Sequence, residues 1–205
     1  QIEGEEQVDS VYTAVSASRD VLEKVIAAGG KMLLVHHGYF WKGEDRTLTG
    51  WMKERVRLCL AHDINLVAYH LPLDYHKTLG NNVQLGELMG WHAQKNIRSS
   101  AGIDLVMMGE VPGGITVGDL AAQLEVRLRQ KPCVIEKDAE RVIQKIAWCT
   151  GAAYDDIQVA IEAGADAFVT GEIAERTVHI AREASISFFA AGHHATERLG
   201  VQALG

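Results

Sequence analysis

The pattern of hydrophobic and polar residues in the first part of the chain is that of a strand, a helix and a second strand, which together form a parallel crossover unit. The segment 10–16 has the pattern of a strand. Within 19–28, apolar residues recur at the spacing of one helical face, and Gly29-Gly30 ends that segment. The run 31–35 is short and apolar, which is typical of a buried strand. The opening therefore predicts strand, helix, strand.

The same patterns predict the elements that follow. Thr116 with Asp119 is a helix N-cap signal, and Lys131-Pro132 ends the helix that it starts. Two stretches rich in turn residues or lacking periodicity are expected to be loops, namely 95–100 and Pro112-Gly113-Gly114. The remaining expected elements are helices over 52–62, 82–89 and 117–130 and a strand over 64–69.

The strand, helix, strand pattern returns 135 residues further along the chain. AVSASRDVLEKVIAAGGKMLLVHHG, which starts at Ala14, aligns without a gap with CTGAAYDDIQVAIEAGADAFVTGEI, which starts at Cys149. The ungapped register favours an ancient duplication over chance. A second match aligns His70-x-x-x-Asp74 with His193-x-x-x-Glu197 at an offset of 123 residues. We expect two related α/β halves, 1–84 and 141–205, with a connecting segment 85–140; the halves are either separate or a single intertwined unit.

Composition and charge narrow the class of protein. In 205 residues, 47% hydrophobic content supplies a core. The formal charge of -7 opposes attraction to a polyanion, so nucleic acid is not expected as a partner. The apolar runs are too short for a membrane span. Because the chain starts at Gln1 rather than Met, we expect further elements outside it. We expect packing thiols in a reducing cytoplasm, since no C-x-x-C spacing joins Cys59, Cys133 and Cys149.

Polar clusters directly follow the predicted strands at four places. In open α/β sheets, ligands bind in the crevice beyond the carboxyl ends of the strands. Imidazoles and carboxylates gathered there are metal-ligand types. A single histidine at a strand end more often has a structural role, but several clusters at equivalent points predict a metal site. The clusters are His36-His37, His70 with Asp74, Glu172, and His193-His194 with Glu197.

The spacing of these residues suits two ions better than one. Neighbouring residues on a strand point to opposite sides, whereas His193 and Glu197 fall on one face of a helix. We expect Glu197 to bridge the ions. His36 and Asp74 would then complete the ligands of one ion. His37 and His193 would complete those of the other, and the remaining coordination positions would suit water or substrate, as in a reactive site.

Other polar residues leave alternatives open. His70 is either a hydrogen-bonded structural histidine or a proton shuttle and occasional ligand. Glu172 occupies the repeat position of His37 and is either a base or a helix first-turn acid favoured by the dipole. Gly80-Asn81-Asn82 suits a tight turn, and nothing matches a P-loop or a dinucleotide fingerprint. The surface histidines are expected to be His62, His76, His92 and His179.

Several long motifs resemble the bacterial YbgI-type branch of the NIF-three-like family, also labelled GTP cyclohydrolase 1 type 2 homologues. The resemblance covers nearly the whole chain and is weakest between Trp91 and Val134. It implies a three-layer α/β/α fold of two pseudo-repeated, intertwined halves, a dinuclear metal site in the cleft between them and a ring-shaped homohexamer. The motifs are VHHGYFWKG, DINLVAYHLPLDYHKTLGNN, AWCTGAA, DAFVTGEIAERT and AGHHATERLG. Carried over by motif, the implied metal ligands are His36, His37, Asp74, His193 and Glu197.

The resemblance also implies an activity. The cyclohydrolase label implies hydrolytic opening of the imidazole ring of guanine in GTP, with two divalent ions, which are iron, zinc or manganese. We expect His70 and Glu172 to take the catalytic roles. The alternative is a non-catalytic metal-binding ring assembly with a regulatory or DNA-damage-tolerance role. No residue is diagnostic for guanine, so the substrate stays open.

Overall fold

The chain folds into two units, and one of them is discontinuous in sequence. The computed structural model describes residues 1–205. Unit 1 comprises Gln1–Leu73 together with Val201–Gly205, and unit 2 comprises Asp74–Gly200. The chain leaves unit 1 within the short helix α3 (Leu71–Asp74) and returns to it within α8 (His193–Leu204). None of the helices combines the length and the apolar character needed to cross a membrane.

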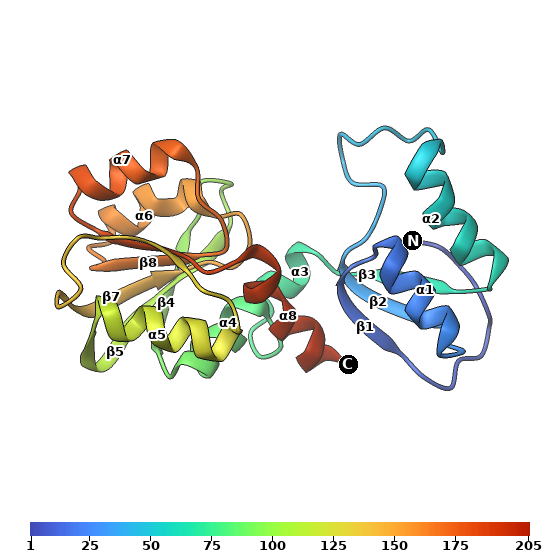
Figure 1. Cartoon of the computed structure of the whole chain (residues 1–205), viewed down its shortest axis with the longest axis horizontal. Coiled ribbons are helices and arrows are strands. Elements are labelled where there is room, and N and C mark those ends of the chain that lie inside the picture. The colour runs from blue at the N-terminus through green and yellow to red at the C-terminus, as the bar shows by residue number, and fades with distance from the viewer. The chain divides into compact units, whose positions relative to one another are not determined.

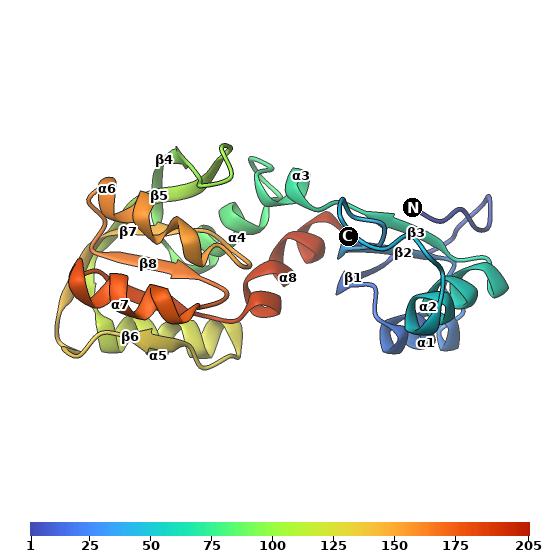
Figure 2. The same cartoon turned by 90° about the horizontal axis from the view of Figure 1, so that it is seen from above.

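Unit 1 is built on a parallel three-stranded sheet with strand order β1-β2-β3 (Figure 1). Helices α1 and α2 cover one face of this sheet, as the view from above shows (Figure 2). The first helix begins where predicted, because the Ser18 hydroxyl caps it by accepting the Val21 N–H. The elements of unit 1 are β1 (Tyr12–Ser16), α1 (Arg19–Ala27), β2 (Met32–His37), α2 (Gly50–Ala61) and β3 (Asn65–Ala68).

Strand β2 sends alternate side chains to the two faces of the unit 1 sheet. Leu33 and Val35 belong to the apolar cluster formed with α1 and α2. Leu34 packs on the opposite face with Val15, Leu73 and Val201. His36 and His37 are the last two residues of this strand, and their ring centroids lie only 4.6 Å apart despite the alternation.

Unit 2 is a three-layer α/β/α structure. Its mixed six-stranded sheet has the order β4-β5-β7-β8-β9-β6, in which β7, β8 and β9 run parallel. Helices α4 and α5 pack on one face, and α6 and α7 pack on the other (Figure 1). The elements are α4 (Asn81–Met89), β4 (His92–Arg98), β5 (Asp104–Thr116), α5 (Val117–Leu128), β6 (Cys133–Ile135), β7 (Val142–Trp148), η1 (Tyr154–Asp156), α6 (Ile157–Glu162), β8 (Ala167–Thr170), α7 (Glu175–Glu183), β9 (Ser187–Ala190) and the first part of α8.

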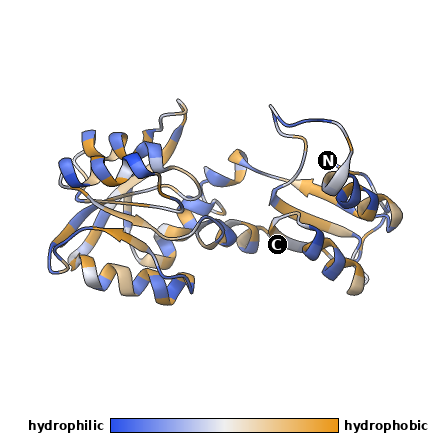
Figure 3. Ribbon diagram, turned by 45° about the horizontal axis from the view of Figure 1, so that its top comes forward, coloured by the Kyte–Doolittle hydropathy of each residue, from blue (hydrophilic) through white to orange (hydrophobic).

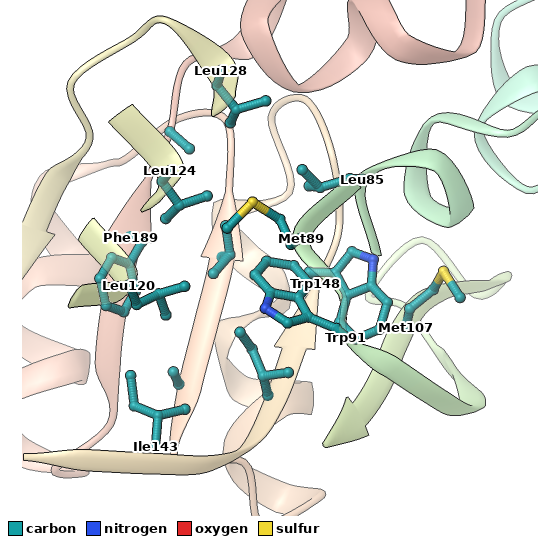
Figure 4. Packing of buried hydrophobic residues seen from close by; sticks show 14 of the residues in the cluster. Leu85, Met89, Trp91, Met107, Leu120, Leu124, Leu128, Ile143, Trp148 and Phe189 are labelled. Atoms are coloured by element: carbon teal, nitrogen blue, oxygen red, sulfur yellow. The ribbon is translucent and has the colours of Figure 1, made fainter. Parts of the chain in front are cut away.

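The larger core of unit 2 centres on two tryptophans (Figure 4). The rings of Trp91 and Trp148 are tilted against each other with centroids 5.0 Å apart, a geometry that adds about 0.5–1.5 kcal/mol beyond area burial. The indole N–H of Trp148 donates to the Asn82 carbonyl over 2.8 Å. A Cβ at Gly86 would lie 2.7 Å from Trp148 Cζ2, so α4 approaches the ring this closely because residue 86 is glycine.

The helices owe their stability to amphipathic faces rather than to length. Hydrophobic and hydrophilic residues occupy different faces of the helices in both units (Figure 3). In α5 the buried residues Leu120, Leu124 and Leu128 recur at intervals of one helical turn. Thr116 caps this helix by accepting the Asp119 N–H over 3.1 Å, as its sequence predicts.

The predicted repeat is present in the fold. The offset of 135 residues places α1 on 154–162, the range that η1 and α6 occupy together. The first two strands of each set pair with the same separation, Ala14 with Val35 and Trp148 with Val169. The mixed α/β fold class is therefore confirmed. The expected segments 1–84, 85–140 and 141–205 stay a prediction, although β4, β5, α5 and β6 all belong to unit 2.

Two predicted loops are wrong. Residues 95–100 lie mostly in β4, and Pro112-Gly113-Gly114 lies inside β5. The pairing of β5 with β7 shifts register between Glu110 and Ile115, and both glycines there have positive φ. Turn residues therefore mark a β-bulge here rather than a loop. Among the cysteines, Cys59 and Cys149 are buried as expected, whereas Cys133 is exposed.

Candidate metal centre

Three histidines of unit 1 gather where β2 and β3 end. His36 and His37 are the last residues of β2, and His70 follows β3. The ring centroids lie 4.6 Å apart for His36 and His37 and 4.8 Å apart for His36 and His70. One ring nitrogen of each lies within 4.8 Å of the others. We call these residues the imidazole cluster.

The hydrogen bonds of the imidazole cluster indicate which nitrogens face a ligand. His36 is fully buried, and its Nδ1 lies 2.9 Å from the Tyr69 carbonyl oxygen. A carbonyl only accepts, so Nδ1 carries a proton, and in the neutral ring Nε2 then carries the lone pair. Nδ1 of His37 lies 3.0 Å from the Ser16 hydroxyl. Both rings thus use Nδ1 for protein contacts, which is the usual arrangement of metal-ligating histidines.

Unit 2 gathers two carboxylates and an imidazole, which we call the carboxylate cluster: Asp74, His193 and Glu197. His193 begins α8 and Glu197 follows one turn later, so Nε2 of His193 lies 3.0 Å from Oε2 of Glu197. Carboxylate oxygens of Asp74 and Glu197 lie within 4.8 Å of each other. Both residues are buried, with exposed fractions of 6% and 3%. Buried carboxylates this close repel one another unless a cation or a proton lies between them, so the donor set fits a divalent ion.

Asn81 fixes the carboxylate of Asp74. Its amide nitrogen donates to Oδ1 of Asp74 over 2.9 Å, and its amide oxygen accepts the Gly200 N–H over 2.9 Å. Asn81 and Asn82 are the first residues of α4 rather than part of a tight turn. Asn81 therefore supports the site, a role that the sequence did not indicate.

Glu172 contacts His193 from the other side of the ring. Its Oε1 lies 2.6 Å from Nδ1 of His193. The hydrogen bond from Glu197 is the main cause that raises the pKa of His193 to about 9, and the bond from Glu172 adds to it against the opposing effect of burial. A pKa this high favours the protonated imidazole of His193 at neutral pH. Coordination through Nε2 would release that proton.

Two glycines allow the backbone to approach the carboxylate cluster. Gly151 follows β7 with φ +73°, and a Cβ there would lie 2.2 Å from Oε1 of Glu197. Gly171 follows β8, and a Cβ there would lie 2.7 Å from Cα of His193. In the sequence, a Thr-Gly pair follows each of the two strands, at Thr150-Gly151 and Thr170-Gly171. These pairs could have indicated the close approach, but they were not recognised as a signal.

The remaining histidines lie outside both clusters. His194 is exposed beside His193. The four that were expected at the surface are all exposed: His62, His76, His92 and His179.

The sequence matches a known protein family over its whole length. The family model described as Duf34/NIF3 (NGG1p interacting factor 3) matches residues 1–205. Relatives named GTP cyclohydrolase 1 type 2 homolog are 47% identical in Neisseria meningitidis and 44% identical in Escherichia coli strain K12, each covering all of this chain. The chain spans 80% and 81% of those proteins.

Solved structures agree with the fold. A structure titled "protein ybgI, unknown function" is 44% identical and superposes with a TM-score of 0.93, covering 100% of this chain and 81% of its own. TTHA1606 from Thermus thermophilus is 29% identical with a TM-score of 0.87, covering 100% of this chain and 80% of its own. The chain therefore belongs to the Duf34/NIF3 family, as the resemblance of its motifs predicted.

Proposed function

We propose that the imidazole cluster and the carboxylate cluster bind two divalent ions together, in a hydrolase that acts on a nucleotide or related heterocycle. The observation that carries this proposal is the orientation of the histidines. Nδ1 of each of three rings contacts a protein group: the Tyr69 carbonyl for His36, Ser16 for His37 and Glu172 for His193. Nε2 of each ring is then the metal-binding atom.

The ligand assignment follows the donor types. His36 and Asp74 would hold one ion, His37 and His193 would hold the other, and the carboxylate of Glu197 would serve both. Histidine nitrogen with carboxylate oxygen suits iron, zinc and manganese alike. Such ions polarise a substrate oxygen and make a nucleophile available at neutral pH when they are bound.

The chain's own residues supply proton transfer and orientation. His70 contacts both His36 and His37 by its ring and is half-exposed, so it can exchange protons with solvent. We assign it the donation of a proton to the leaving group. Glu172 orients His193 and is also exposed enough to accept a proton from substrate or water. Both roles are separable by experiment.

The substrate class rests on the relatives. The homologues that cover the whole chain are named for GTP cyclohydrolase, which supports a nucleotide or related heterocycle as substrate. We propose that the protein works as a ring-shaped homohexamer. Light scattering of the purified protein tests the assembly independently of activity.

Activity should be tested on protein whose metal content has been measured first. Protein loaded with iron, zinc or manganese is incubated with GTP and a nucleotide panel, and ring-opened products are followed by absorbance and mass spectrometry. His70→Gln should lower kcat by about 10²–10⁴-fold at unchanged metal content. Exposed His62→Gln serves as the control, and equal kcat for the two variants would contradict the role of His70.

Absence of turnover has a defined meaning. If two ions are bound and no member of the panel reacts, the hydrolase proposal fails. The protein is then a metal-binding ring assembly with a regulatory or DNA-damage-tolerance role. In that case His37→Ala should weaken assembly in the same protein, and an intact hexamer after complete chelation would contradict this second proposal.

A further inference from the structure

Three aromatic rings lie against His70, and one of them does not belong to the proposed metal ligands. The rings of His36 and His37 contact it edge-on, with centroids at 4.8 and 5.3 Å. The third ring is that of Trp41, whose centroid lies 5.1 Å from that of His70 at an interplanar angle of 48°. Centroids about 4.5–7 Å apart are typical of aromatic rings in contact. Trp41 therefore contacts the residue to which we assign proton donation.

Trp41 does not pack into a hydrophobic core. Its side chain is partly buried, yet it belongs to none of the four apolar clusters of the two units. Large apolar side chains usually obtain their burial from such a core. The indole ring of Trp41 instead obtains at least part of its burial from the imidazole of His70.

Three consecutive aromatic residues have different surroundings at this point of the chain. Tyr39 is buried in the unit 1 core, and its hydroxyl donates to the Ala17 carbonyl over 2.6 Å. Phe40 is 39% exposed, and its backbone has φ +63°, a left-handed conformation that a bulky residue rarely adopts. Because the backbone changes direction here, Trp41 does not follow Tyr39 into the core and lies against His70 instead.

The turn that follows Trp41 is closed by two reciprocal hydrogen bonds. The Trp41 N–H donates to Oε2 of Glu44 over 3.0 Å, and the Glu44 N–H donates to the Trp41 carbonyl over 3.1 Å. The backbone of Trp41 is thus fixed between the buried anchor Tyr39 and this closed turn. Backbone strain such as that of Phe40 persists where the surrounding structure holds it, and it clusters at functional sites.

We propose that Trp41 is a positioning residue, which holds the ring of His70 in the orientation needed for proton transfer at the metal centre. Each ring contact excludes some rotamers of His70, so loss of the largest of the three rings widens the range of its orientations. A reacting group that is misplaced by about 1 Å can lose about 10²-fold in rate. This inference rests on the proposed function, because it serves the role assigned there to His70.

Crystal structures of Zn²⁺-loaded variants test the position of His70 without a substrate. Trp41→Ala should show the His70 ring in a changed rotamer or in more than one conformer, whereas Trp41→Phe retains an aromatic ring and should keep the wild-type orientation. Trp41→Leu keeps apolar volume without the ring and should displace His70 as well, so the test survives if Trp41→Ala does not fold. The zinc content of each variant should equal that of the wild type, because Trp41 supplies no ligand.

A second tryptophan of unit 1 provides the matched control. Trp51 is 66% exposed on α2, and the guanidinium of Arg55 lies over its ring with Cζ 4.6 Å from the centroid. It has no place in the imidazole cluster. Trp51→Ala removes the same side chain from the same unit and should leave the ring of His70 unchanged.

A substrate found in the nucleotide panel adds a kinetic test. Trp41→Ala should lower kcat by about 10²-fold with KM little changed, and Trp41→Phe should recover most of this loss. Combined with His70→Gln, Trp41→Ala should lower kcat little further, because both changes remove the same contribution. A residue that only stabilised the fold would lower kcat independently of His70.

The outcomes separate this inference from the hydrolase proposal. An unchanged His70 ring in Trp41→Ala, an equal displacement in Trp51→Ala, or a displaced ring in Trp41→Phe would each overturn the positioning role. Wild-type kcat in Trp41→Ala would keep the hydrolase and reject this role. If no nucleotide is turned over, the hydrolase proposal fails, while a displaced ring in Trp41→Ala alone would still show that Trp41 sets the orientation of His70.

Discussion

At the scale of single residues, the contact between Glu172 and His193 determines how α8 presents its imidazole. The carboxylate lies 2.6 Å from Nδ1, and Nε2 is directed to Glu197. Glu172→Ala should lower the affinity for Zn²⁺ by about 10–100-fold, because groups that orient a ligating histidine contribute this much. Glu172→Gln keeps an acceptor for the Nδ1 proton and should retain most of the affinity. Competition titration with a chelating dye measures both.

The same variants test whether Glu172 is also a base. Glu172→Gln with full metal content and lost turnover would assign the base role, whereas retained turnover would leave orientation as its only role. Exposed Glu175→Ala is the matched control on α7. Equal Zn²⁺ affinity in Glu172→Ala and Glu175→Ala would contradict the orienting role.

The sequence indicated these site residues to different degrees. The histidines and carboxylates could be predicted as ligand candidates because each follows a predicted strand within a distinctive motif. Asn81 could not, because its amide oxygen binds a backbone N–H that lies 119 residues away. Gly151 likewise acquires its role only through the approach of Glu197. Contacts between distant segments have no local pattern to reveal them.

At the scale of elements, α4 depends on one glycine. Helix propensity alone favours alanine over glycine by about 1 kcal/mol. A Cβ at position 86 would nevertheless lie 2.7 Å from the Trp148 ring, within a closely packed core. Gly86→Ala should therefore destabilise the protein, by about 1–3 kcal/mol for overpacking less the gain in propensity. Urea unfolding followed by tryptophan fluorescence measures this, with exposed Glu87→Ala as the control; a rise in the urea midpoint of Gly86→Ala would contradict it.

Glu136, which follows β6, should make the stability of unit 2 depend on pH in the acidic range. Burial raises the pKa of Glu136, but hydrogen bonds from the Lys137 and Asp138 N–H groups, Arg141 and Ser187 together bring it below the ordinary 4.5. A lowered folded pKa contributes stability that is present above about pH 4.5 and is lost as pH falls through the folded value. Glu136→Gln should be less stable at pH 7 and should lose less stability on acidification. Urea midpoints across this range measure it, and a curve parallel to that of exposed Glu140→Gln would contradict it.

Predictability differed between elements for physical reasons. The helices α1, α2, α4 and α5 could be predicted because each buries one face, and α1 and α5 also have clear end signals. Strand β4 was missed because polar residues fill it, and the end of β5 was missed because the bulge at Gly113 and Gly114 resembles a loop in sequence. Only the pairing with β7, a tertiary interaction, identifies that segment as a strand.

At the scale of the whole molecule, the proposed centre requires ligands from both units. At a free metal concentration of about 100 times the Kd, each bound ion should add about 2.7 kcal/mol to the free energy of unfolding. His37→Ala in unit 1 and His193→Ala in unit 2 should both reduce this gain, and the double variant should lose little more than either single one. Thermal unfolding with and without metal measures it, with His62→Ala and His179→Ala as controls. Additive losses would instead mean that each unit binds its ion separately.

The discontinuity of unit 1 has a consequence for biosynthesis. Val201 completes the apolar cluster with Val15, Leu34 and Leu73, yet it is translated after the whole of unit 2. On the ribosome, unit 2 can therefore close its core from a contiguous stretch of nascent chain, while the first unit to emerge must wait for its last hydrophobic contact. Of the two units, the one that is translated earlier thus matures later, and one face of its sheet stays incomplete until Val201 has been made.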